Sequence, residues 1–117
     1  MKATLFLAML LPGVFADEQQ FSYMDGNRLL QQCDEESRAF CSGYVAAAMD
    51  SNNTFLNSMQ ATMKQHVSPM YCLPKDGIDL GQAVRIIVKW LHNHPEKLHL
   101  RGDTLVWESL RDAFPCK

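Results

Sequence analysis

The chain has 117 residues, 47% of them hydrophobic, and a net charge of −2 at pH 7. A weakly acidic chain without a cluster of lysines and arginines does not suit nucleic-acid binding or electrostatic attachment to an anionic membrane. The length fits one domain, and a domain of this size buries only a limited core. If the chain is exported, its four cysteines are the expected source of additional stability.

The first 16 residues predict a cleaved signal peptide. Lys2 supplies a positive start, residues 4–11 are apolar, and Ala16 ends a stretch of the kind that a signal peptidase reads. The apolar run is too short to span a bilayer, and no later run is as long. We therefore expect export and a single domain over residues 17–117, which are 101 of the 117 residues.

Two helices are predicted in the first half of this domain. Asp25-Gly26 opens a short one, whose residues up to Cys33 present one apolar face. The acids at 34–36 suit the positive end of a second helix. Small residues at 43–48 leave this second helix slim, so a neighbour can pack close to it.

Polar residues at 50–53 predict the end of the second helix and offer caps for a third. The third helix ends near His66 and carries an apolar stripe at helical spacing, formed by Phe55, Leu56, Met59 and Met63. Residues 68–77 follow with two prolines and a glycine. They are the one long irregular stretch that the sequence predicts.

The fourth helix has the clearest start, because Asp79 and Gln82 have the spacing of a capping box. Its apolar stripe from Leu80 to Leu91 is wide enough to predict contacts on more than one side, and Pro95 ends it. A last helix is predicted over about residues 103–113. No segment alternates as strands do, so we predict an all-α bundle of four to five helices.

Four exported cysteines predict two disulfides, and they allow three pairings. On one unbroken helix Cys33 and Cys41 would lie about 12 Å apart, whereas a disulfide tolerates Cα separations up to roughly 7 Å. If these two pair, the chain must therefore turn between them, and we expect the turn at the acid-rich residues 34–36. We predict this pair together with Cys72–Cys116, which would tie a proline-flanked loop to the C-terminus.

No constellation of residues suited to catalysis is evident. His92, His94 and His99 come closest to a zinc set, but on a helix the first two point about 200° apart, and Pro95 then redirects the chain. A cysteine nucleophile needs a free thiol, and we expect all four cysteines to be paired. We therefore expect neither an enzyme nor a bound metal or cofactor.

Six short motifs follow one another along the chain. They are Leu29-Leu30 before Cys33, Phe40-Cys41-x-Gly43-Tyr44, Cys72-Leu73-Pro74, Gln82 ahead of an apolar helix, His94-Pro95-Glu96-x-Leu98-His99, and Ala113-Phe114-Pro115-Cys116. Together they resemble the Tai/Rap family of type VI secretion amidase immunity proteins over essentially the whole mature chain.

The resemblance implies an all-helical homodimer in the bacterial periplasm. It would bind a secreted, papain-like peptidoglycan amidase and block its catalytic cleft, which protects the producing cell and its siblings. We expect the dimer to use the slim face at 43–48 or the outer side of the helix from Leu80 to Leu91.

Recognition is usually carried by loops on a rigid scaffold, so we expect partner contacts in the segment 68–77 and at the predicted helix junction 50–54. For Tyr71 two alternatives stay open: an exposed anchor, or inward packing beside Cys72. The candidate partner-binding residues are Asp50, Asn52, Asn53, Ser68, Met70, Tyr71, Lys75 and Asp76.

Two other functions fit a small exported helical protein. A periplasmic chaperone or stress protein would lose its dimer and its stability near pH ~3–4, where carboxylates become protonated. A carrier of small molecules would need a dry internal cavity, for which two tryptophans and six phenylalanines are few.

Overall fold

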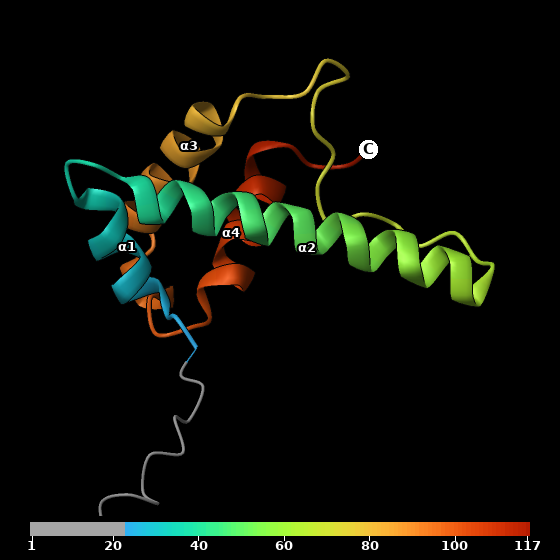
Figure 1. Ribbon diagram of the computed structural model, residues 1–117, viewed down its shortest axis with the longest axis horizontal. Helices are drawn as coiled ribbons and strands as arrows, with labels where there is room; N and C mark the ends of the chain where they lie inside the picture. The colour runs from blue at the N-terminus through green and yellow to red at the C-terminus, as the bar shows by residue number, and fades with distance from the viewer. Residues whose placement is uncertain (1–22) are drawn as a thin grey trace, which may run out of the picture.

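The computed structural model describes residues 23–117, which form four α-helices and one short 3-10 helix (Figure 1). The elements are α1 (Gly26–Asp34), α2 (Ala39–Met63), α3 (Leu80–Asn93), η1 (Pro95–Lys97) and α4 (Gly102–Ala113). Within this range the only β-type pairing is an isolated bridge between Asp25 and Arg101. The all-α prediction is confirmed. The predicted signal peptide, residues 1–16, lies outside the described residues.

Two helices begin where the sequence predicts, and the cap predicted at Asp79 is confirmed. The Asp79 carboxylate accepts a hydrogen bond of 2.7 Å from the backbone N–H of Gln82 at the start of α3. Asp25 caps α1 in the same way, accepting from the N–H of Arg28 at 2.9 Å. Each bond satisfies a backbone donor that the first helical turn would otherwise leave unpaired. At the other end, α3 stops at Asn93, two residues before Pro95.

The predicted break at residues 50–53 is wrong, because α2 runs unbroken through them for 25 residues. Asn52 points inward and is buried beneath the loop that carries Tyr71, so tertiary packing outweighs the weak helix propensity of these polar residues. The helix is therefore about 37 Å long. Figure 1 shows its C-terminal half extending beyond the other three helices.

The predicted start of α2 at the acids 34–36 is also wrong. Asp34 is the last residue of α1, and α2 begins at Ala39 after Arg38, which has a left-handed backbone with φ of 49°. The turn brings the Cα atoms of Cys33 and Cys41 to 4.9 Å, and the two cysteines are joined. The expected turn between the two cysteines is thus present, at residues 35–38, and only the start of the second helix lies later than the acids suggested.

The core lies between α3 and the three helices that contact it. α3 contributes Ile87 and Leu91, which are completely buried, as are Leu29 of α1, Val45 of α2 and the α4 side chains Leu105, Val106 and Leu110. The wide apolar stripe of α3 is thus covered from several sides, as its sequence predicts.

A close backbone contact joins the start of α1 to the start of α4. The N–H of Gly26 donates to the Leu100 carbonyl at 3.0 Å, and the N–H of Gly102 donates to the Met24 carbonyl at 2.7 Å. A Cβ on Gly26 would stand 2.9 Å from the Leu98 Cα, and a Cβ on Gly102 would stand 2.9 Å from the Tyr44 hydroxyl. Both positions therefore require glycine for lack of space.

We expect Gly26→Ala to lower the free energy of unfolding by about 1–3 kcal/mol, because the new methyl group meets backbone atoms that cannot move aside. Urea denaturation followed by circular dichroism measures the change. Gly43→Ala is the control. No atom lies within 4 Å of a Cβ at Gly43, which is exposed on α2, so that variant should gain up to ~1 kcal/mol from helix propensity. Equal losses in both variants would contradict the crowding argument.

Candidate partner-binding surface

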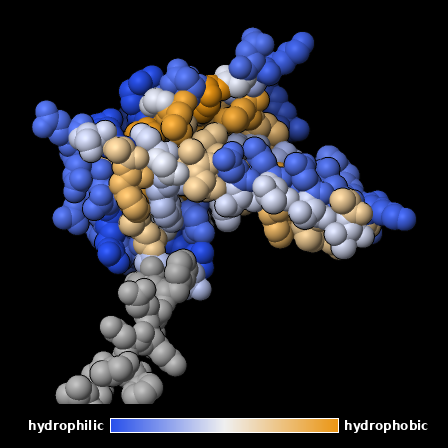
Figure 2. Space-filling model, viewed as in Figure 1, coloured by the Kyte–Doolittle hydropathy of each residue, from blue (hydrophilic) through white to orange (hydrophobic). Residues whose placement is uncertain are grey.

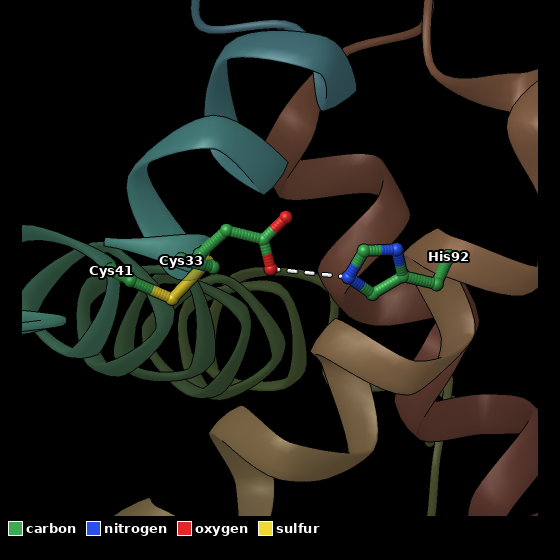
Figure 3. The surroundings of a disulfide bond; sticks show 4 residues. Cys33, Cys41 and His92 are labelled. Carbon is green, nitrogen blue, oxygen red and sulfur yellow. Dashed lines mark hydrogen bonds and ion pairs between the residues drawn. A yellow bond between two sulfur atoms is a disulfide. The ribbon is translucent and has the colours of Figure 1, made fainter. Parts of the chain in front are cut away.

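Both predicted disulfides are confirmed, and they fix the segments that flank α2. Cys33–Cys41 joins the end of α1 to the first turn of α2 (Figure 3). Cys72–Cys116 joins the irregular segment between α2 and α3 to the C-terminus. Beside this second bond, the N–H of Cys72 donates to the Phe114 carbonyl at 2.8 Å. The long connection from 64 to 79 is thereby attached to the end of α4.

The three histidines that could have formed a zinc set are dispersed. His92 Nε2 lies 3.1 Å from the Asp34 carboxylate and links α3 to α1, as Figure 3 shows. His94 stacks on Trp90 at 4.0 Å between ring centroids, and its Nδ1–H donates to the Trp90 carbonyl at 2.7 Å. Among residues 23–117, no three histidine, cysteine or acidic side chains gather in a way that could hold a metal ion.

Six of the eight candidate partner-binding residues are exposed. They are Asp50 and Asn53 on α2, and Ser68, Met70, Lys75 and Asp76 on the connection to α3. Because α2 does not break, Asp50 and Asn53 project from a helix instead of a junction.

The other two candidates, Tyr71 and Asn52, are buried at 6% and 5% exposure. For Tyr71 the structure decides between the two alternatives: the ring packs inward. Burial raises the pKa of its hydroxyl, the charge of Asp50 adds to this, and the Asn52 side chain opposes it. Within the described part of the chain the Tyr71 hydroxyl makes no hydrogen bond of normal geometry. Tyr71 thus holds the connection in place without presenting itself to a partner.

The projecting half of α2 carries exposed apolar side chains. Phe55 is 58% exposed and Met63 is 50% exposed, while Leu56 and Met59 are half-buried. Met70, at 37%, is exposed on the connection that follows. Figure 2 shows apolar surface along this arm, with polar residues on the rest of it. We call residues 53–63, together with the connection 64–79, the arm and its loop.

A second apolar surface lies at the packed end of α2. A groove of about 350 Å³ runs along the slim face of this helix, and its walls include Phe40, Tyr44 and Ala47, together with Tyr23. Arg101 also lines it, donating to the Asp103 carboxylate at 2.8 and 3.1 Å and lying 3.9 Å from the Tyr23 ring centroid. This guanidinium holds the pKa of the Asp103 carboxyl below its usual range.

The sequence indicated only part of this groove. The small residues at 43–48 mark its floor, but Tyr23, Arg101 and Asp103 were not among the candidate residues. They reach the groove only because the start of α4 pairs with the start of α1.

The sequence model of a protein family matches this chain from Asp25 to Cys116, a range that includes all four helices of the described residues and both disulfides. That family is described as Rap1a immunity proteins. The chain belongs to the Rap1a immunity protein family. No curated protein and no solved structure matches it significantly.

Membership of the Rap1a immunity proteins implies a cognate effector that this chain binds. The two disulfides fit a compartment that is oxidising, where such bonds persist. In the described region, no helix has the length and apolar character needed to cross a bilayer.

We expect the two simplest substitutions of Tyr71 to act in opposite directions. Tyr71→Ala should cost about 3–5 kcal/mol of stability, because it leaves a cavity beside the core. Tyr71→Phe should gain about 1 kcal/mol, because it removes a buried hydroxyl that makes no hydrogen bond of normal geometry with Asn52 or any other described residue. Thermal and urea unfolding measure both changes. A loss of more than ~1 kcal/mol in Tyr71→Phe would mean that the hydroxyl is hydrogen-bonded in solution.

Proposed function

We propose that this protein binds a peptidoglycan amidase delivered by a type VI secretion system and covers its active-site cleft, so that the producing cell and its siblings are not lysed. Membership of the Rap1a immunity protein family supports effector neutralisation. The ordered motifs from Leu29 to Cys116, which resemble amidase immunity proteins, support a papain-like amidase as the target.

Occlusion, with no reaction of its own, is the means that we propose. All four cysteines are disulfide-bonded, so none of them is available as a nucleophile. A blocking protein needs exposed apolar anchors on a scaffold that loses little entropy on docking. The arm and its loop have this character, since Phe55, Met63 and Met70 are exposed and the loop is closed by Cys72–Cys116.

We place the protein in the periplasm, as one domain over residues 17–117 after removal of the signal peptide. The sequence of residues 1–16 supports export, and the two disulfides suit the destination. An amidase that acts on peptidoglycan works in the same compartment.

Substitutions in the arm and its loop test whether this surface binds the amidase. Phe55→Ala and Met70→Ala should each weaken binding to the amidase by about 2 kcal/mol, close to 30-fold, because each removes an apolar anchor. Leu100→Ala is the matched control. Leu100 is 37% exposed, as Met70 is, but it lies beside Gly26 at the opposite end of α4 from Phe114 and the loop. Calorimetric titration with the purified amidase measures the affinities.

Survival of cells tests the function itself. Cells that express the amidase in the periplasm should lyse, and co-expression of this protein with its signal peptide should prevent lysis. Equal lysis with and without the protein would refute the proposal for that amidase. If both arm variants protect the cells fully and bind the amidase with native affinity, only the choice of the arm as the contact surface is refuted.

We also propose that two copies associate through the groove on the packed end of α2. Tyr44, Ala47 and Phe40 offer apolar surface there, and Gly43 beside them leaves room for a second helix. The outer side of α3, where Leu80 is exposed, is the other predicted interface.

Ala47→Arg should convert the proposed dimer into a monomer without unfolding it, because Ala47 is exposed and a long cation cannot be accommodated between two apolar faces. Ala61→Arg places the same charge on the exposed arm of the same helix and should leave the dimer intact. Sedimentation equilibrium at tens of micromolar distinguishes the two. A wild-type monomer at that concentration would refute the dimer, and a dimeric Ala47→Arg variant would refute this interface.

A further inference from the structure

The two disulfides lie in opposite environments. Cys33 and Cys41 are completely buried and belong to the core. Cys72 and Cys116 are both exposed, and each lies outside the helices. The first bond joins two packed helices, whereas the second joins an irregular segment to the last residues of the chain.

This difference determines which bond a reductant can reach. Reduction begins when a thiolate attacks one sulfur of the disulfide, so the rate depends on access to that sulfur. Attack on Cys33–Cys41 requires α1 or α2 to leave the core, where Leu29 and Val45 are also completely buried. Attack on Cys72–Cys116 requires no such opening.

The exposed bond is the one covalent link between the loop and the C-terminal residues. Among the described contacts of residues 64–79 with the rest of the protein are the Tyr71 ring in the core and the hydrogen bond from Cys72 N–H to the Phe114 carbonyl. A longer contact, 3.5 Å, runs from the Gln60 side chain to the Val67 carbonyl. Without the disulfide, the loop and the C-terminal residues would depend on these contacts and on Leu73, Ile78 and Phe114, which are partly buried against the core.

We propose that Cys72–Cys116 is a redox-sensitive clamp: a dithiol reductant opens it in the folded protein while Cys33–Cys41 stays closed, and opening it loosens the loop on either side of Tyr71 and weakens binding of the effector. The reaction is thiol–disulfide exchange. The S–S bond accepts two electrons and two protons and gives two cysteine thiols, while the dithiol gives them up and forms its own disulfide. The last step of the proposal rests on the proposed function of the arm and its loop.

The first test needs no effector. The native protein is treated with increasing dithiothreitol in the absence of denaturant, alkylated, and analysed by peptide mass mapping. Cys72 and Cys116 should be labelled at least about tenfold faster than Cys33 and Cys41, and the helical circular dichroism signal should persist. Labelling of all four cysteines together, or loss of helicity as Cys72–Cys116 opens, would overturn the clamp.

The second test measures binding to the purified amidase. The protein with Cys72 and Cys116 alkylated, and the Cys72→Ser/Cys116→Ser variant, should bind at least about tenfold more weakly than the oxidised protein, because the loop must then be ordered on docking. The reductant is removed before the amidase is added, since a papain-like enzyme has its own reactive cysteine. Reduced, unalkylated protein should regain its affinity after reoxidation, and the serine variant should be indifferent to the same treatment.

Each outcome of the binding test is decisive. Unchanged affinity after selective opening would overturn the control of binding by the clamp. Failure of the oxidised protein to bind any amidase would instead refute the proposed function, and the selectivity of reduction would still decide whether Cys72–Cys116 is the labile bond.

Discussion

Burial of α3 is the constraint on which the other elements depend. Its apolar residues occupy more than one side of the helix, so a single neighbour could not remove them from water. Ile87 and Leu91 reach complete burial only because α1, α2 and α4 all contact α3. Polar groups hold the packing at its edges: Trp90 Nε1–H donates to Asp112 at 2.8 Å, and Trp107 Nε1–H donates to the Ala48 carbonyl at 2.9 Å.

This arrangement divides α2 into two parts with different surroundings. Residues up to Asn52 pack against the other helices, with Val45 and Ala48 buried, while the following residues project beyond them. An isolated helix of that length is marginal in water, so the projecting part derives its order from the packed part with which it is continuous. The helix therefore presents Phe55 and Met63 on a stiff arm, and a stiff arm loses little entropy when a partner covers it.

The two apolar surfaces lie on different stretches of the same helix. The groove takes in α2 from Phe40 to Ser51, and the arm begins just beyond it. Under our proposals, a second copy occupies the groove and the amidase meets the arm, so that the two partners use separate segments of α2. The chain then needs no rearrangement to bind both, because its packed end is fixed by Cys33–Cys41 and its loop by Cys72–Cys116.

The sequence by itself determined the features that arise from neighbouring residues: the helix start at Asp25, the cap at Asp79, the stop before Pro95, the all-α class, and the requirement for a turn between Cys33 and Cys41. Only the tertiary structure decided the continuity of α2 through residues 50–53, the burial of Tyr71, and the approach of Tyr23 and Arg101 to Phe40. The physical reason is the distance along the chain over which each interaction acts. A cap or a proline acts within one helical turn, whereas Asn52 stays helical and Tyr71 turns inward because of packing between segments that are far apart in the chain.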